Sequence, residues 1–469
     1  MGKSTFDTLS LVLAGPFYSY QTPPERLASQ ILTTTADQNG LFKFKIQTGD
    51  SPVHVSLFLS SKRNSEGYLI GNGEIAHYLI LPGDSIHVLF DHRMPIFSGK
   101  GADVFEVQYR LEQIDKDQRK LKSNANDDLR KHIKKWLDQK DSLLTEQLDL
   151  LDLYRPKLGV GTYSVIRADL IGSNRAFVYQ SIGFNKPFFA MENTLPSDLA
   201  VVCNELRKRP AYFSSSDRAA LAPKYIYYLY EKLKIDEKFK RFTDVGKVAM
   251  GNNYFSPIST QFSGMVRDKL LTWWLMDLAS VNGLEPEYVT SSLGVMQTPV
   301  FIDFVTNLQT TYGKGQPLSD FDFKDSNGQT VHLSDFKGKV VVLDLWFTGC
   351  SACVLVAKGM PYVEEEFKNR SDVIFMSISV DTDKEQWLQS IRQNPAGKYF
   401  SSSSTIYLYT AGTGENNPFI KKYVPQGAYP CLFIIDKDGK IYSSKPSRPL
   451  NHELKLKLIN EVNSALSGK

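Results

Sequence analysis

Two cysteines separated by two residues carry the clearest chemistry in this sequence of 469 residues. Cys350 and Cys353 enclose Ser351 and Ala352, after an apolar run and at the start of a helical pattern. A pair in this position lies at a helix N-terminus, where free N–H groups and the helix macrodipole stabilise a thiolate. The thiolate is the attacking species in disulfide exchange. We therefore expect Cys350 to attack and Cys353, one helical turn later, to resolve the mixed disulfide.

Two other uses of a Cys-x-x-Cys pair fit the sequence less well. Structural zinc needs four ligands, and no second cysteine pair or His-x-His spacing lies near this one. Covalent haem attachment needs a histidine after the second cysteine, whereas position 354 is Val. The sequence therefore predicts a redox pair that uses no metal and no other cofactor. Cys203 and Cys431 are the remaining cysteines, too few and too unevenly spaced for the disulfide framework of a small secreted fold.

A carboxyl group lies in the apolar run that leads to the pair. Asp344 stands six residues before Cys350, within residues 341–347. Burial raises the pKa of a carboxyl group, which would let Asp344 accept and return the proton of the resolving thiol near neutral pH. The alternative is a structural aspartate near the end of a strand, with its carboxyl satisfied by hydrogen bonds.

The elements that must position these residues occupy the last third of the chain. The Gly/Pro segment 312–317 predicts a linker, so we place the start of a domain at residue 312. The segments that follow alternate between strand and helix patterns, which indicates an α/β layer fold. The predicted strands are 339–347, 373–380, 432–435 and 440–443, and the predicted helices are 351–367, 384–393 and 451–466.

The first two thirds of the chain predict two further parts, which makes the whole a multidomain α+β protein. Short alternating runs separated by turn residues indicate a β-sandwich-like domain over residues 1–100. One hairpin is expected at 37–46 and another at 78–90, around Pro82-Gly83-Asp84. A helical period then predicts an α-helical region over 101–311, with long helices at 107–121, 125–151 and 219–239. The third domain is 312–469.

Composition excludes some partners and names none. The sequence has 55 basic and 51 acidic residues, a formal charge of +4, which argues against nucleic-acid binding as the main task. No run approaches the roughly 18 apolar residues of a spanning helix, so no transmembrane segment is expected. The aromatic runs 225–230 and 273–276 favour a helix–helix core over a ligand groove.

Further residues around the cysteines complete a pattern. Residues 331–339 lead into the strand of Asp344 and Trp346, and Tyr429-Pro430 precede the segment 431–440. With the cysteine pair, these residues resemble the TlpA/ResA-like branch of the thioredoxin superfamily, thiol-disulfide oxidoreductases of the bacterial envelope, over residues 315–469. The resemblance implies a thioredoxin-like fold, a cis Pro430 facing the pair, and substrate contacts by Trp346, Tyr429 and Pro430. The alternative for Pro430 is a simple proline at the start of a strand.

Several positions depart from that pattern. Gly349 replaces the usual Trp and Ala352 the usual Pro, which leaves the reduction potential and its direction open. Val356 replaces a glutamate found in some ResA-like proteins, so proton handling is left to Asp344. Cys431 stands where threonine commonly follows the cis-proline, which makes it a candidate third redox thiol; the alternative is a small buried residue.

These features together predict a thiol-disulfide oxidoreductase. The resemblance favours a reductase that takes electrons from an upstream thiol donor and passes them to a protein or small-molecule disulfide. The β-rich start also resembles a domain of such proteins in Bacteroidetes, which implies the periplasm or the cell envelope, although no signal peptide is visible; the alternative is the cytoplasm.

Two other functions and one role for the first two regions remain open. One alternative function is a binding or scaffold protein with a regulatory redox pair. The other is a peroxidase, for which Thr348 alone does not supply the required neighbourhood. We expect residues before 315 to position the redox domain against a client or a second copy of the chain in a homodimer.

Overall fold

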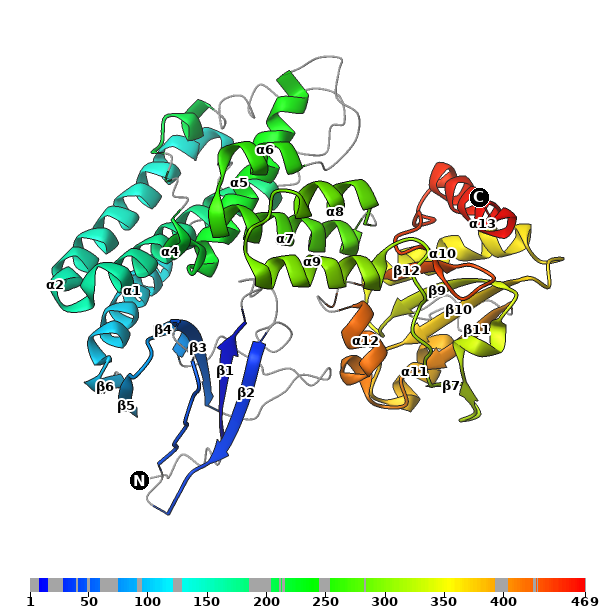
Figure 1. Cartoon of the computed structure of the whole chain (residues 1–469), viewed down its shortest axis with the longest axis horizontal. Coiled ribbons are helices and arrows are strands. Elements are labelled where there is room, and N and C mark those ends of the chain that lie inside the picture. Colours follow the sequence, from blue (N-terminus) through cyan, green and yellow to red (C-terminus); the bar gives the residue numbers. More distant parts are fainter. Residues whose placement is uncertain are drawn as a thin grey trace. The chain divides into compact units, whose positions relative to one another are not determined.

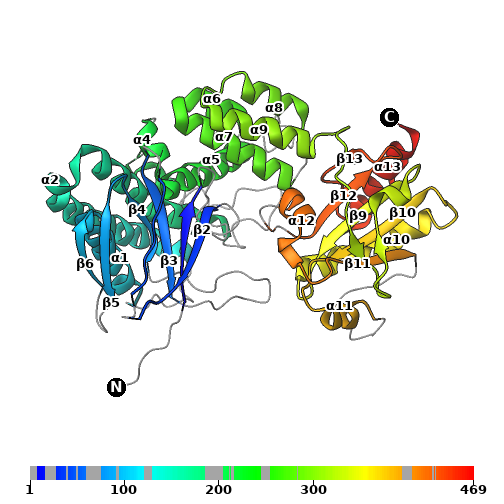
Figure 2. The same ribbon diagram turned by 60° about the horizontal axis from the view of Figure 1, so that its bottom comes forward.

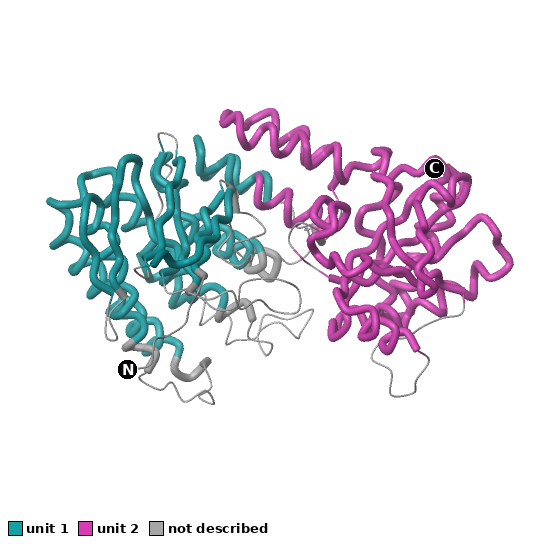
Figure 3. The backbone as a smooth tube through the Cα atoms, turned by 90° about the horizontal axis from the view of Figure 1, so that it is seen from below, with its two compact units in different colours: residues 1–62, 69–271 teal, residues 63–68, 272–469 magenta. Residues whose placement is uncertain are grey.

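The computed structural model divides into two compact units, shown in Figure 3 in teal and magenta. Unit 1 comprises residues 1–62 and 69–271, and unit 2 comprises residues 63–68 and 272–469. Residues 272–311 thus group with the residues that follow them, while the three domains expected from the sequence stay a prediction. The structure describes residues 8–15, 28–38, 41–48, 51–59, 75–90, 95–120, 129–184, 204–210, 212, 216–243, 254–281, 284–392, 404–424, 427 and 429–468.

Unit 1 begins with a four-stranded antiparallel sheet in the order β2-β1-β3-β4 (Figure 2). Alternate residues of β1 face the core, where Leu9, Leu11 and Leu13 pack with Val55 of β3 and Phe105 of helix α1 (Ala102–Lys120). This alternation follows from the two-residue period of a strand. The strands are β1 (Thr8–Ala14), β2 (Ala28–Thr35), β3 (Val53–Leu59) and β4 (Ile75–Ile80).

The structure corrects both hairpins that we expect in this region. β4 and β5 (Ser85–Phe90) are joined by a tight turn but belong to different sheets, because β5 pairs with β6 (Pro95–Lys100) instead. Residues 41–46 alternate in exposure, yet they form no strand. The β-sandwich itself stays a prediction, since the described strands of unit 1 form one four-stranded and one two-stranded sheet.

Most of the other described residues of unit 1 are helical, as the helical period predicts. Helix α2 packs along α5, with Tyr225 and Tyr228 of α5 buried in the core. Pro156 does not break α2; the helix kinks three residues later, at Gly159, whose φ of 70° is not helical. The helices are α1 (Ala102–Lys120), α2 (Leu129–Phe184), α4 (Asp217–Ala220), α5 (Pro223–Thr243), α6 (Phe255–Gln261) and α7 (Gly264–Val281), whose residues are divided between the two units.

Unit 2 is built on a seven-stranded mixed sheet in the order β13-β12-β9-β10-β11-β7-β8 (Figure 1). β9, β10 and β11 are parallel, and β12 runs antiparallel to β9. One face packs against α10 (Ser351–Glu366) and α13 (His452–Ser467) through Val342 and Leu432. On the other face, Tyr423 of α12 (Pro418–Tyr423) packs against Phe433. The strands are β7 (Phe323–Lys324), β8 (Thr330–Val331), β9 (Val340–Trp346), β10 (Val373–Ser379), β11 (Thr405–Tyr409), β12 (Cys431–Ile435) and β13 (Ile441–Ser443).

The strand and helix pattern predicted for this unit is confirmed to within a few residues at each end. The helices are α8 (Pro286–Leu293), α9 (Pro299–Tyr312), α10 (Ser351–Glu366), α11 (Lys384–Ile391), α12 (Pro418–Tyr423) and α13 (His452–Ser467). β11 and α12 have no counterpart in the prediction. The segment expected to be a linker pairs with β13 instead, because Gly315 N–H donates to the Ile441 carbonyl and Ile441 N–H to the Gln316 carbonyl. None of the described helices is long and apolar enough to span a membrane.

Candidate functional site

The two cysteines lie at the N-terminus of α10, directly after the loop that follows β9. Cys350 is the N-cap residue, and its Sγ accepts the backbone N–H of Cys353 at 3.1 Å. The two are joined in a disulfide, with their Cα atoms 5.2 Å apart. Cys350 is 7% exposed and Cys353 is 0% exposed, so Cys350 is the more accessible residue of the pair. A helix N-terminus also favours the thiolate form of Cys350 once the disulfide is reduced.

A glycine sets the backbone of the loop just before the pair. Gly349 is exposed and has a φ of 100°, a conformation that side chains with a Cβ rarely adopt. A second glycine lets α10 approach the loop before α13, because a Cβ on Gly359 would lie 1.8 Å from the Pro449 carbonyl oxygen. The positive φ at Gly349 and the close approach of the Pro449 carbonyl at Gly359 explain why both residues are glycine.

A buried carboxylate anchors the same loop from the end of β10. Asp381 is 8% exposed, and it accepts the N–H of Thr348 at 3.0 Å and the hydroxyl of Thr348 at 2.7 Å. The Ser379 hydroxyl donates to the same carboxylate at 2.6 Å. Since the Thr348 proton is given to Asp381, Ser390 donates to the Thr348 oxygen at 2.8 Å. Asp381 therefore fixes the segment that ends at Cys350.

Aromatic side chains pack around the cysteines. Trp346 is 1% exposed and forms a buried cluster with the two cysteines and Trp387, so it lies beneath the pair rather than on the surface. Tyr429 and Phe347 are half-buried, pack against this cluster, and have their ring centroids 5.5 Å apart. Tyr429 is thus the better placed of the two predicted aromatic substrate contacts, and the contact roles of both stay a prediction.

The peptide bond between Tyr429 and Pro430 is cis, as the resemblance implies. The Arg448 guanidinium donates to the Pro430 carbonyl at 3.0 Å, which holds the segment from outside the sheet. The next residue, Cys431, is 3% exposed, and its Sγ lies 4.0 Å from Lys445 Nζ. Burial raises the pKa of the Cys431 thiol, with a smaller opposite effect of the Lys445 charge. Cys203, by contrast, lies outside the described residues.

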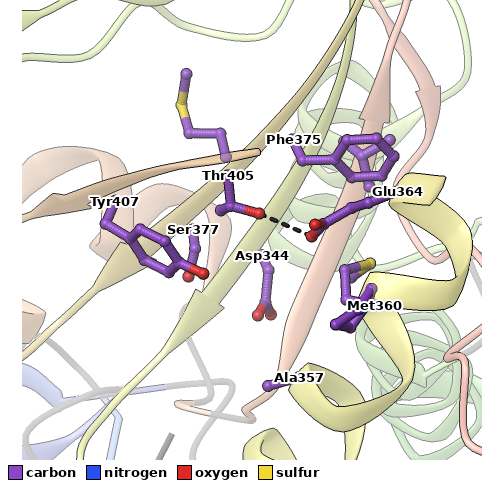
Figure 4. A pocket seen from close by; sticks show the side chains of 11 residues that line it. Asp344, Ala357, Met360, Glu364, Phe375, Ser377, Thr405 and Tyr407 are labelled. Atoms are coloured by element: carbon purple, nitrogen blue, oxygen red, sulfur yellow. Dashed lines mark hydrogen bonds between the residues drawn. The ribbon is translucent and has the colours of Figure 1, made fainter. Parts of the chain in front are cut away.

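Asp344 lies on β9 and is 4% exposed. It pairs in register with Leu432 of β12, so it faces α10, whereas Cys431 is opposite Leu345 and faces the other side of the sheet. Asp344 and Ala357 line the same small cavity (Figure 4). Ala357 is one helical turn after Cys353, so Asp344 faces the side of α10 that carries the resolving cysteine. Among the described residues, no group of three or more His, Cys, Asp or Glu side chains could hold a metal ion.

Comparison with known proteins identifies this part of the chain. Residues 314–444 match the AhpC/TSA family. The thiol-disulfide oxidoreductase ResA of Bacillus thuringiensis is 30% identical over 129 residues, and that of Bacillus subtilis is 38% identical over 135 residues. The last third of the chain is a thioredoxin-like domain related to ResA. Its order of strands and helices and its cysteine pair at the start of a helix agree with that assignment.

The similarity is confined to this thioredoxin-like domain. Each ResA match covers 27% of the chain, and the chain spans 66% and 64% of the lengths of the two ResA proteins. The thioredoxin domain of a thiol-disulfide oxidoreductase from Bacteroides vulgatus is 25% identical and covers 32% of this chain and 96% of its own, with a TM-score of 0.26.

The thioredoxin-like domain also contains site residues that we do not predict from the sequence. Asp381 is one of them, because its partner Thr348 is 33 residues away in the sequence. Glu364 is another: its side chain accepts hydrogen bonds from Ser404 and Thr405 and lines the cavity beside Asp344. The sequence does contain a signal for the burial of Glu364: it lies four residues after Met360 and three before Phe367, which is the spacing of one face of a helix.

Proposed function

We propose that this protein is a thiol-disulfide oxidoreductase in which Cys350 is the nucleophile and Cys353 the resolving thiol. The observation that carries the proposal is the position of Cys350 at the N-cap of α10, where its Sγ accepts the Cys353 N–H. Cys350 also retains a small solvent exposure, whereas Cys353 has none. The hydrogen bond and the helix N-terminus both favour a thiolate at Cys350.

The reaction follows from these positions. A dithiol donor first reduces the Cys350–Cys353 disulfide and is itself oxidised to a disulfide. The Cys350 thiolate then attacks a substrate disulfide, forms a mixed disulfide and releases one substrate thiolate, which takes up a proton. Cys353 loses its proton to Asp344 and attacks Cys350 Sγ, which releases the second substrate thiolate and restores the internal disulfide. Two electrons pass from donor to substrate.

The substrate class, direction and location also belong to the proposal. ResA relatives named as thiol-disulfide oxidoreductases support a protein or small-molecule disulfide as substrate. We place the enzyme in the bacterial envelope, acting as a reductase, with Tyr429 and Pro430 contacting the substrate beside Cys350. The remainder of the chain would present the redox domain to its client or to a second copy.

Trapping the mixed disulfide tests the mechanism. In Cys353→Ser, reduced protein mixed with a disulfide probe should form a stable adduct on Cys350, detected by mass, because the resolving thiol is missing. Cys350→Ser is the matched variant and should form no adduct at a comparable rate, since Cys353 is fully buried. Equilibration of the unmodified chain with glutathione buffers should give a reversible two-electron couple.

Two outcomes would replace this function by another. An inert pair that does not equilibrate with glutathione would favour a binding or scaffold protein in which the pair is structural. Rapid consumption of peroxide that continues in Cys353→Ser would favour a peroxidase, because a peroxidatic thiolate needs no Cys353 for its first turnover.

A further inference from the structure

Four large apolar side chains are exposed on the thioredoxin-like domain, two of them on α10 and two at the start of α13. Leu355 and Tyr362 of α10 are 57% and 45% exposed, and Leu450 and Leu456 are 52% and 43% exposed. Large apolar side chains that are exposed singly are ordinary, whereas a contiguous group of them marks an interaction site. We call these four residues the apolar strip, and the contacts between their neighbours show that it is contiguous.

The middle of the apolar strip is formed where α10 touches the chain before α13. Leu355 and Tyr362 are seven residues apart, which places them two turns apart on one face of the helix. Between them, Gly359 lies so close to the Pro449 carbonyl that a Cβ there would be 1.8 Å from the oxygen. Leu450 is the next residue, so it lies beside the face of α10 that carries Leu355 and Tyr362.

The far end of the strip lies at the contact between α10 and α13 (Figure 1). The Tyr362 ring packs edge-on against His452, with the ring centroids 5.9 Å apart. Lys455 Nζ lies 5.2 Å from the centroid of the same ring. Leu456 follows Lys455 and is one helical turn after His452, so it continues the strip along α13.

The near end of the strip reaches the redox pair. Ser351 and Ala352, which separate the two cysteines, are exposed, and Leu355 lies on the exposed side of the next turn. By the helical rise per residue, the exposed face of α10 from Ser351 to Tyr362 is roughly 16 Å long. A small-molecule disulfide that reacts with Cys350 covers only the beginning of this length, whereas a protein covers all of it.

We propose that the apolar strip is a docking surface for the protein whose disulfide reacts with Cys350. This inference rests on the proposed function and leaves its exchange steps unchanged. Lys358 is the only charged residue of α10 before Glu364, so the exposed face of the helix beside the pair is almost uncharged. The partner that fits this surface is a protein with an exposed apolar patch next to its disulfide, because the strip offers contact area and few polar groups.

Single-turnover reduction of two disulfides by the reduced full-length protein tests the strip. Insulin serves as the protein disulfide and glutathione disulfide as the small one. Tryptophan fluorescence follows both reactions, since Trp346 and Trp387 pack against the cysteines. Leu355→Ser and Tyr362→Ser should each lower the rate constant with insulin about tenfold, the effect of removing one interface anchor, and that with glutathione disulfide less than about twofold.

A matched control comes from another exposed apolar residue of unit 2. Val300 is 44% exposed on α9 and lies outside the strip. Val300→Ser removes a similar amount of exposed apolar surface and should leave both rate constants at the value of the unmodified protein. All three substitutions truncate side chains that are largely exposed, so the core of the domain stays intact.

Several results would overturn the docking surface and leave the oxidoreductase in place. Equal falls in both rate constants would mean that the strip acts on the cysteine pair itself. Unchanged rate constants would mean that another part of the chain or a second copy covers the strip, and loss of a dimer in sedimentation of Tyr362→Ser would identify the second copy. Reduction of glutathione disulfide without reduction of insulin would also refute it. An unmodified protein that reduces neither disulfide would remove the proposed function, and this inference with it.

Discussion

Replacing Asp381 by alanine should release the loop that carries Cys350. The carboxylate accepts three hydrogen bonds of 2.6–3.0 Å, two of them from Thr348. A hydrogen bond to a charged group contributes about 1.5–3 kcal/mol, and such contributions add incompletely. We therefore expect Asp381→Ala to lower the free energy of opening of this loop by about 3–5 kcal/mol, since the buried donors of Thr348 and Ser379 lose their acceptor.

Amide hydrogen exchange measures this quantity locally. The Thr348 N–H is protected by Asp381, so peptides covering residues 346–350 of the oxidised full-length chain should exchange faster in Asp381→Ala. The expected acceleration is about 150-fold to 4,000-fold, at about 1.4 kcal/mol per tenfold. Cys350 should also react less selectively with its substrates in this variant, because the loop no longer holds it at the N-cap of α10.

Asp383 provides the matched control two residues away. It is exposed and caps α11 by accepting the N–H groups of Glu385 and Gln386. Asp383→Ala removes an N-cap, which costs about 1 kcal/mol, and its effect should stay within α11. Equal exchange of residues 346–350 in the two variants would refute the anchoring role of Asp381.

Three further outcomes are expected. Gly349→Trp, which restores the usual residue of the family, should lower the free energy of unfolding of unit 2 in urea by about 1–3 kcal/mol, because φ is 100° at this position. Ala352→Pro, in the first turn of α10, should change that free energy little. Cys431→Ser should change the midpoint potential by less than about 30 mV, since burial raises the pKa of that thiol and keeps it protonated; a larger change would make it a third redox thiol. Burial and then the Lys224 charge lower the pKa of His54 to about 3 from 6.5, and the same two causes lower the pKa of His77 to about 3, so stability present above pH 6.5 is lost as pH falls. Each of the two histidines should cost unit 1 about 2 kcal/mol at pH 5, and His54→Gln should remove its share of that loss.

The sequence predicts the thioredoxin-like domain well because its signals are local. β9 is apolar at every position except Asp344, and α10 begins at the residue after Cys350 and keeps a helical period to Glu366. Buried central strands and capped helices of this kind are recognisable without any partner. The sequence alone therefore predicts that the cysteine pair lies at a helix N-terminus.

Pairing between distant segments could not be predicted in the same way. The turn at 81–84 forms as expected, but nothing in a short alternating strand says which sheet it joins, and β5 pairs with β6 instead of β4. Residues 41–46 alternate between exposed and half-buried side chains, as a strand at the edge of a core does, and still form no strand. Asp381 was missed for a related reason, because an acid after a strand has no signature until Thr348 is brought to it by the fold.

Glu364 shows what a stricter reading of the helical period could have found. Residues 364–366 are three consecutive glutamates, which ordinarily indicate a solvated helix face. The core positions of α10 are Met360, Val363 and Phe367, and a helix that buries these residues also buries position 364. One glutamate of the three therefore had to point inward, where a carboxyl is stable only with donors such as Thr405.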